Sequence, residues 1–420
     1  MSSVNEPLQL DTPYVVFVVF QTGRLANGGV ESITQVLERC RQVKPVVVTQ
    51  RETRVTQRWR SAGIRVEVWP CENSEPAKAM TAGLVIQSEQ NLTFWQQFRS
   101  HWQTNWRMYQ LLRSLPCTVV HCNDHRSLWQ TALGAKLAGA KVIFNIRDIK
   151  TPEESYDWRW QMAAQLSDDH LLLSQAMRQQ WIDRLNIPVN RQTSVHAIYS
   201  VVDFNQFRPV DGEQRRQLRS ALQIPEDGIA LGYVATFNPK KAQLNFLERA
   251  VPLLREKLPQ VKFYFIGDFD PAHDSYARSC QQAVERLGLE DCVRFVGFTA
   301  QVACWYQALD LTVVASRREG LARCMIESLA CGTPVISFEV CSAREILVEH
   351  QCGGVFPQGD YGDLVEAIVQ FGQTPPLREQ WRLAGIQTAR LLFQPQAVVE
   401  QYEALYLSSM ASKPIMHYAN

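Results

Sequence analysis

The sequence has no long apolar run, no metal-binding motif and almost no net charge. No stretch of 18 uncharged apolar residues occurs among its 420 residues, which argues against a transmembrane helix. Neither a CxxC pair nor an HExxH motif is present, so we expect no resident metal and no other cofactor. The formal net charge of +1 gives no indication of a nucleic-acid partner.

Cysteine is present, but not in the pattern of a disulfide framework. The eleven cysteines are odd in number and irregularly spaced, and Cys122, Cys324 and Cys331 lie in apolar stretches typical of small buried side chains. The N-terminal sequence MSSVNEPLQLDTP also lacks the charged-then-apolar layout of a secretion signal. We therefore expect a reducing, cytoplasmic location, with the inner face of the membrane as the alternative.

What the chain does contain is enough apolar sequence for two globular cores, because 46% of its residues are hydrophobic and 20% are charged. Short β-branched runs alternate with amphipathic stretches, as in NFLERAVPLLREKL (245–258), in both halves. This alternation predicts parallel strands joined by helices. The expected strands are 14–20, 44–50, 64–69, 118–123 and 140–146, then 229–236, 261–267, 291–297, 311–316 and 333–338.

The pattern predicts an α/β protein with two Rossmann-like, doubly wound domains that face a central cleft. We expect an N-terminal domain over 1–199, a C-terminal domain over 200–395, and a helix and tail over 396–420 that pack back toward the first domain. Ligands of such sheets bind beyond the carboxyl ends of the strands, so the informative residues should directly follow strands.

Two strand-to-helix loops carry groups suited to phosphate. Gly28 and Gly29 open a predicted helix, and paired glycines at a helix N-terminus let an anion approach the backbone. A plain loop-to-helix turn is the alternative for this weak signal. Lys240 and Lys241 follow the strand that ends near Thr236, and lysine is a point charge that suits phosphate oxygens. A solvated surface pair is the alternative there.

A third loop carries carboxylates. Glu319 precedes a predicted helix, ARCMIESLAC, and Glu327 lies within it among apolar neighbours. A carboxylate at a strand end can accept hydrogen bonds from pairs of sugar hydroxyls, whereas one among apolar residues needs a partner unless it marks the solvated edge of the helix. Phosphate-binding and hydroxyl-binding groups together predict a nucleotide-sugar ligand.

These residues resemble the family-4 glycosyltransferases, retaining enzymes of the GT-B architecture. The most specific feature is the Glu-x7-Glu spacing of Glu319 and Glu327, followed by ACGTPVISF. The resemblance extends over roughly residues 14 to 406, and further similar segments are 27–32, 119–148, 197–209, 261–268, 293–298 and 353–368.

The resemblance implies a role for each matching position. Glu319, with the backbone of Gly320 and Leu321, would bind the donor sugar, and Glu327 would bind the ribose. Lys241 would hold the diphosphate, Gly28 and Gly29 would lie against the phosphates and acceptor, and the backbone around Arg294 would meet the base.

The chain departs from the family at two positions. Thr236 stands where the family usually has a second diphosphate-binding arginine, and Arg147 stands where it often has a histidine. Arg147 could replace that histidine as an anion contact, and Arg24 could also reach the cleft. His125 follows a strand, so a sugar contact and a structural role are both open.

The resemblance implies a hexosyltransferase that moves sugar from a nucleotide diphosphate sugar to a hydroxyl of a glycan, glycolipid or small molecule, with retention and without metal. Polysaccharide biosynthesis is the broad setting. Two alternatives remain: a catalytically silent GT-B protein with a binding or regulatory role, which Thr236 and Arg147 keep open, and a nucleotide-sugar epimerase.

The segment 92–115 is unusually aromatic. At helical spacing, one stripe carries five aromatic residues with arginines beside it: Trp95, Phe98, Trp102, Trp106 and Tyr109, and Arg99, Arg107 and Arg113. Packing against the sheet of the first domain is the ordinary interpretation of an amphipathic helix. The alternative is a helix that lies on a membrane surface, because aromatic residues and arginine suit the interface.

Overall fold

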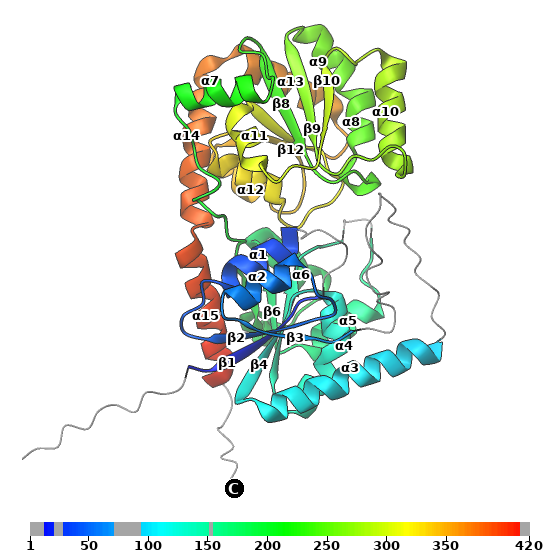
Figure 1. The fold of residues 1–420 in the computed structure, drawn as a ribbon, viewed down its shortest axis with the longest axis vertical. Helices are drawn as coiled ribbons and strands as arrows, with labels where there is room; N and C mark the ends of the chain where they lie inside the picture. Colours follow the sequence, from blue (N-terminus) through cyan, green and yellow to red (C-terminus); the bar gives the residue numbers. More distant parts are fainter. Residues whose placement is uncertain (1–11, 21–27, 71–93, 151–153, 412–420) are drawn as a thin grey trace, which may run out of the picture.

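The computed structural model describes residues 12–20, 28–70, 94–150 and 154–411, apart from the side chains of 94–98. It contains two parallel sheets, each covered by helices on both faces (Figure 1). The chain therefore has the two-domain, Rossmann-like architecture that the sequence predicts.

The first domain contains a seven-stranded sheet in the order β3-β2-β1-β4-β5-β6-β7, with every described pairing parallel. Its strands are β1 (Tyr14–Val18), β2 (Lys44–Thr49), β3 (Arg65–Val68), β4 (Cys117–Cys122), β5 (Lys141–Ile146), β6 (Asp169–Leu172) and β7 (Val195–Ala197). Its helices are α1 (Gly28–Leu37), α2 (Arg54–Ser61), α3 (Phe94–Ser114), α4 (His125–Leu137), α5 (Trp158–Leu166) and α6 (Gln175–Arg184).

The second domain contains a six-stranded parallel sheet in the order β10-β9-β8-β11-β12-β13. Its strands are β8 (Ile229–Val234), β9 (Val261–Ile266), β10 (Val293–Gly297), β11 (Leu311–Val314), β12 (Val335–Phe338) and β13 (Gly353–Phe356). Its helices are α7 (Gly212–Ala221), α8 (Gln243–Arg249), α9 (Val251–Lys257), α10 (Ser275–Leu287), α11 (Val302–Ala308), α12 (Arg323–Ala330), α13 (Tyr361–Gln373) and α14 (Pro375–Leu392).

One predicted helix is broken in the structure. The segment 245–258 is divided at Ala250 into α8 and α9, and Pro252 lies in the first turn of α9. Proline fits the first turn of a helix because its missing N–H would be unpaired there, whereas inside a helix it removes a hydrogen bond.

The chain crosses between the domains twice, and the two crossings lie side by side. The backbone N–H of Val202 donates to the carbonyl of Phe393 at 3.2 Å, and the rings of Tyr199 and Phe393 meet edge to face. After the return crossing, α15 (Pro395–Ala411) runs along the first domain (Figure 1). There Tyr402 and Tyr406 are buried in the same apolar cluster as β1 and α1, so α15 is part of the first core.

A carboxylate of the second domain caps a helix of the first. Glu345, in a π-helical turn (Arg344–Val348), accepts hydrogen bonds from the backbone N–H groups of Gln175 and Ala176 at 3.1 and 2.7 Å, and from the hydroxyl of Tyr199. Gln175 and Ala176 open α6, whose first N–H groups have no partner within the helix. The buried Glu345 therefore binds one domain to the other through backbone hydrogen bonds and the helix dipole.

We expect Glu345→Ala to lower the free energy of unfolding by about 2 kcal/mol, because two helix N–H groups lose their acceptor at a domain boundary. The urea midpoint measures this loss. Glu349→Ala is the matched control, since Glu349 is exposed one turn further on. Equal midpoints for the two variants would contradict the bridging role of Glu345.

Candidate functional site at the junction of the two domains

Lys241 and Glu319 form an ion pair between two loops of the second domain. Lys241 ends a 3-10 turn (Pro239–Lys241) after β8, and Glu319 lies between β11 and α12. Both side chains are largely buried, and the Tyr233 hydroxyl donates to the Lys241 carbonyl. Burial by itself lowers the pKa of Lys241, but Glu319 outweighs it and holds that pKa above its ordinary value. The lysine is therefore a permanent positive charge at the carboxyl end of the sheet.

Glu327 is buried in α12 and paired with Arg323 one turn earlier. The Arg323 Nη2 atom lies 2.7 Å from the Glu327 carboxylate, and the Tyr306 hydroxyl donates to the same carboxylate at 3.5 Å. Burial raises the pKa of Glu327, and Arg323 opposes that rise. The structure thus excludes a solvated helix edge for Glu327 and provides the partner that a buried carboxylate needs.

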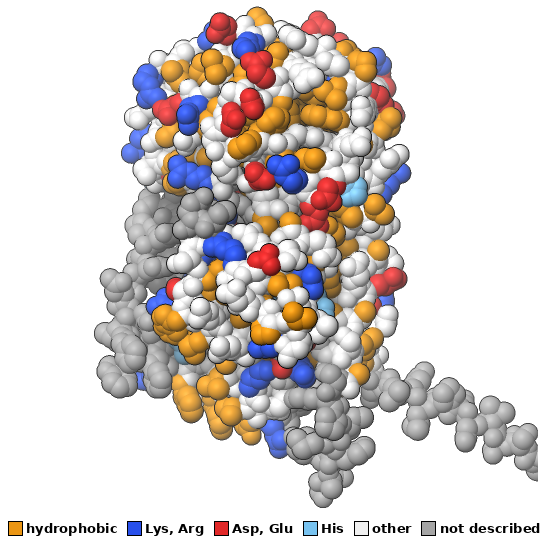
Figure 2. Space-filling model, turned by 180° about the vertical axis from the view of Figure 1, so that it is seen from behind, with side chains coloured by type: hydrophobic (Ala, Val, Ile, Leu, Met, Phe, Trp, Pro, Cys, Tyr) orange, Lys and Arg blue, Asp and Glu red, His pale blue; other side chains and the backbone are white. Residues whose placement is uncertain are grey.

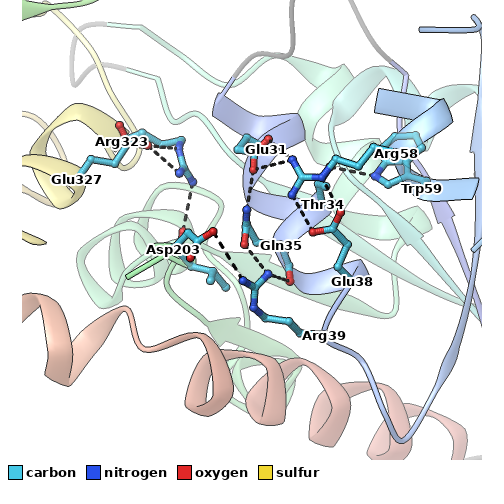
Figure 3. A network of polar contacts seen from close by, with 11 residues as sticks. Glu31, Thr34, Gln35, Glu38, Arg39, Arg58, Trp59, Asp203, Arg323 and Glu327 are labelled. Atoms are coloured by element: carbon cyan, nitrogen blue, oxygen red, sulfur yellow. Dashed lines mark hydrogen bonds and ion pairs between the residues drawn. The ribbon is translucent and has the colours of Figure 1, made fainter. Parts of the chain in front are cut away.

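Arg323 also reaches the first domain (Figure 3). Its Nη1 atom donates to the Val201 carbonyl at 3.3 Å, and a Cβ atom on Gly28 would lie 2.6 Å from the Arg323 Cδ atom. Glycine at position 28 therefore lets the N-terminus of α1 approach α12. That terminus, where Gly28 and Gly29 lie, directs the positive end of the helix dipole toward the junction.

Figure 3 also shows a chain of polar contacts that holds α1 in place behind this junction. Glu31 and Glu38 pair with Arg58 of α2, and Gln35 binds both Glu31 and Arg39. Arg39 also pairs with Asp203, two residues after Val201, so the contacts connect α1 and α2 with the segment that Arg323 reaches.

Arg147 follows β5 and carries an unusual buried atom. Its Nη1 atom is enclosed and has no hydrogen-bond partner in the part of the chain that the structure describes. Burial lowers the pKa of Arg147, and the nearby Arg323 lowers it further, whereas Tyr402 and Asp124 oppose the shift. A buried cationic donor without an acceptor is costly in an empty site and favourable once an anion arrives.

Ion pairs join the loops that carry these residues across the junction. Lys240 lies 2.7 Å from Asp148, which directly follows Arg147, and Arg318 lies 2.7 Å from Glu154 and 3.5 Å from Asp148. Figure 2 shows acidic and basic side chains together near the boundary between the two domains. These groups are partly exposed, so each pair adds little stability, but together they align the loops that follow β5, β8 and β11.

The two domains approach each other closely at Gly320. A Cβ atom there would lie 2.4 Å from the Arg147 carbonyl oxygen and 3.0 Å from the Met177 Cε atom. The Gly320 carbonyl accepts from the Ser342 hydroxyl at 2.7 Å, and Leu321 is buried in the core. The loop after Glu319 is thus packed against the first domain.

The structure brings together Gly28, Arg147, Lys241, Glu319 and Glu327 at the junction, but it places other predicted residues elsewhere. His125 stacks on Trp160 at 4.7 Å and accepts from Trp129 Nε1 at 2.7 Å, within an aromatic cluster of the first domain. Burial lowers the pKa of His125. Thr236 is exposed and shares a loop with Lys241, where it accepts from Asn238 at 3.2 Å. Arg24 lies outside the described residues.

Arg294 on β10 turns its side chain away from the junction. Its guanidinium donates to the Leu222 carbonyl at 2.8 Å and lies over the Trp305 ring, 5.7 Å from its centre. Any contact between position 294 and a nucleotide base would therefore involve its backbone, as the resemblance implies.

Sequence reasoning missed Arg323 and Asp148. Arg323 stands four residues before Glu327, a spacing that pairs opposite charges on one helix face, so this signal could have identified it. Asp148 directly follows Arg147 at a strand end, but nothing in the sequence indicates its partner, Lys240.

The described residues contain no group of three or more His, Cys, Asp or Glu side chains placed to hold a metal ion. Among the same described residues, no helix combines the length and apolarity needed to cross a bilayer.

Comparison with known proteins identifies both domains. Residues 52–206 match the family described as Glycosyltransferase Family 4, and residues 214–388 match Glycosyl transferases group 1. The chain belongs to the family-4-like glycosyltransferases of GT-B fold.

Two curated relatives share part of this sequence. A Bacillus subtilis (strain 168) protein provisionally named glycosyltransferase EpsD is 30% identical over 226 residues, which are 54% of this chain and 57% of that protein. The D-inositol 3-phosphate glycosyltransferase of Thermomonospora curvata is 32% identical over 200 residues, 46% of each chain. The matches thus span about half the length of these relatives.

Solved structures share the whole fold. Anabaena Alr3699/HepE in complex with UDP superposes with a TM-score of 0.76 at 20% identity, over 94% of this chain and 99% of that one. Sucrose-phosphate synthase from Thermosynechococcus elongatus superposes with a TM-score of 0.73 at 17% identity, over 96% and 100% of the two chains. At these identities the likeness establishes the GT-B architecture.

Proposed function

We propose that this protein transfers a hexosyl group from a nucleotide diphosphate sugar to an acceptor hydroxyl, with retention of anomeric configuration and without a metal ion. The observation that carries the proposal is the buried Lys241–Glu319 pair at the junction, with Glu327 and the N-terminus of α1 close by. The UDP bound to Alr3699/HepE supports a nucleotide-sugar donor.

The charges suit a diphosphate leaving group. When the bond from the anomeric carbon to the diphosphate breaks, negative charge grows on the phosphate oxygens. Lys241, the enclosed Nη1 of Arg147 and the N-terminus of α1 would stabilise that charge from three directions. These fixed positive groups could supply the charge neutralisation that a metal provides elsewhere.

The carboxylates suit hydroxyl groups. Glu319 would accept hydrogen bonds from the donor sugar, and Glu327 from the ribose. Glu327 is now paired with Arg323, so ribose binding would share or replace that pair. A new bond from the acceptor oxygen to the anomeric carbon forms on the face that the diphosphate leaves, and the acceptor proton passes to the departing diphosphate.

Ion pairs between the domains favour transfer over hydrolysis. Lys240–Asp148 and Arg318–Glu154 hold the loops of both domains against each other, which would keep water from the activated sugar. The acceptor would be a glycan, a lipid-linked glycan or a small molecule, and the described residues do not favour one of these over the others.

A donor screen tests the proposal. We expect one of the UDP-, GDP- or ADP-sugars to raise the melting temperature, with about 2.7 kcal/mol of stabilisation at 100 times its Kd. Excess EDTA should leave both binding and transfer unchanged, and NMR of the product should show retained anomeric configuration.

Each other outcome identifies a different function. Conversion of the donor sugar without acceptor would show an epimerase, and nucleotide binding without turnover across the donor and acceptor panels would show a silent binding protein. Stabilisation by none of the donors would contradict the proposed site itself.

A further inference from the structure

Helix α3 leaves aromatic side chains exposed that its packing does not need. Its buried residues Met108, Leu111 and Leu112 lie in the first core, and Asn105 accepts from the Gly134 N–H of α4 at 2.8 Å. The helices touch so closely at this point that a Cβ atom on Gly134 would lie 1.9 Å from the Asn105 carbonyl oxygen. The predicted packing on the domain therefore exists, but it uses only one side of the helix.

The other side continues onto α4 as one apolar surface. Trp102 is 58% exposed, Trp106 52%, Leu133 47% and Leu137 66%, and we name these four residues the tryptophan face. The described residues that line the hollow between the helices are these four with Asn105, Tyr109 and Gly134. Trp106 stacks on Tyr109 with ring centres 5.4 Å apart. Trp95 and Phe98 of the predicted stripe have side chains outside the described residues.

The charged residues of the two helices that carry the tryptophan face have one sign. Neither α3 nor α4 contains an aspartate or glutamate, whereas α3 carries the exposed residues Arg99, Arg107 and Arg113. Two acidic residues next to α4 are already engaged: Asp124 caps that helix by accepting from the Ser127 N–H, and Asp168 pairs with Lys136. Within the described helices α3 and α4, an anionic surface would therefore meet basic side chains and no acidic one.

Figure 2 shows hydrophobic side chains gathered at the end of the first domain that is remote from the second. This end carries α3, which lies far from the domain junction in Figure 1. Contact through the tryptophan face would thus leave the junction open to small ligands.

We propose that the tryptophan face docks on the surface of an anionic phospholipid bilayer. Tryptophan suits the headgroup region because its ring is apolar and its N–H is polar, and arginine binds lipid phosphate while its stem stays in the apolar zone. A helix that lies in the surface plane needs an apolar side of this kind and a cationic flank, not the length of a membrane span. The one-signed charge favours anionic lipid over a protein partner or a second copy of this chain.

Vesicle flotation of the full-length protein tests this docking without any measurement of sugar transfer. Wild-type protein should float with vesicles that contain phosphatidylglycerol at low salt, float much less with pure phosphatidylcholine, and release as salt rises. Arg99→Gln with Arg107→Gln should lower the partition coefficient by about 25-fold, since each arginine contributes about fivefold.

Trp102→Ser with Trp106→Ser should lower the partition coefficient at least about tenfold and leave the unfolding midpoint near that of the wild type, because both rings are already half exposed. Leu391→Ser with Arg390→Gln on α14 is the matched control. Leu391 is about as exposed as Leu137 of the tryptophan face, and Arg390 is exposed, so this variant should float like the wild type.

Three results would overturn the proposal. They are no flotation of the wild type with anionic vesicles at low salt, equal flotation of the tryptophan variant, and equal loss in the α14 control. Sedimentation of the protein without lipid identifies one further outcome. If the wild type is a dimer and the tryptophan substitutions abolish it, this face is a contact between copies of the chain. Because binding alone is measured, failure of the donor screen would leave these results interpretable.

Discussion

Replacing Lys241 by alanine is expected to lower kcat/KM for sugar transfer by about 100- to 1,000-fold, the usual cost of removing one charged or hydrogen-bonding group that stabilises developing negative charge. Glu319→Gln should have a comparable effect through the donor sugar. The reason lies in their geometry: two largely buried, opposite charges meet at the ends of β8 and β11, where a diphosphate and a sugar would lie side by side.

Lys240→Ala is the control for this prediction. Lys240 is the neighbouring lysine, but its Nζ atom is engaged with Asp148 of the first domain, and we expect a loss below about tenfold because partly exposed ion pairs contribute little. The double variant Lys241→Ala with Glu319→Gln should lose less than the product of the single losses, since each single change leaves the other group without its partner. Turnover like that of the wild type in both purified single variants, Lys241→Ala and Glu319→Gln, would contradict the proposed site.

Gly320→Ala is expected to have the second large effect, by forcing the domains apart. Its new methyl group would lie 2.4 Å from the Arg147 carbonyl oxygen, and a backbone atom cannot move aside as a flexible side chain can. We expect transfer to fall more than about tenfold, and the free energy of unfolding to fall by about 1–3 kcal/mol, which is typical of overpacking. Activity, the urea midpoint and the radius of gyration measured by X-ray scattering together report the change.

Gly362→Ala in the first turn of α13 is the matched substitution. A Cβ atom there meets the Asp360 carboxylate oxygen at 3.5 Å, an ordinary contact, and alanine favours helix, so stability should stay constant or rise slightly. If Gly320→Ala were as active and compact as Gly362→Ala, the close approach of Gly320 to Arg147 would not matter for function.

The strands found from the sequence are those with a strong local signal. Runs such as VVFV in β1 and FYF in β9 are β-branched or aromatic and buried on both faces, so they are typical of central parallel strands. β6 (DHLL), β7 (VHA) and β13 (GGVF) were not predicted, because polar residues or glycine interrupt these short segments and leave no continuous apolar run. Such strands form because a neighbouring strand offers hydrogen-bonding groups, which local propensity does not reveal.

The aromatic stripe of α3 also shows a feature that the sequence predicts only in part. Helical spacing predicted one apolar side for α3, and both interpretations of that side, packing in the domain and exposure to a membrane, were compatible with the sequence. The structure assigns Met108 to the core and leaves Trp102 exposed, because α4 covers only part of the helix surface.

The sequence by itself determined the class of fold, the loops that would carry chemistry and the spacing of the two glutamates, since strand periodicity, helix starts and the Glu-x7-Glu pattern are local features. The tertiary structure decided which of these groups have partners: Arg323 for Glu327, Lys241 for Glu319, and no acceptor for the enclosed Nη1 of Arg147 within the described residues. The Lys241–Glu319 pair forms because β8 and β11 are neighbours in the second sheet, whereas the surroundings of Arg147 depend on how the two domains meet. Both arrangements result from contacts between residues far apart in the chain, such as Glu345 with the start of α6.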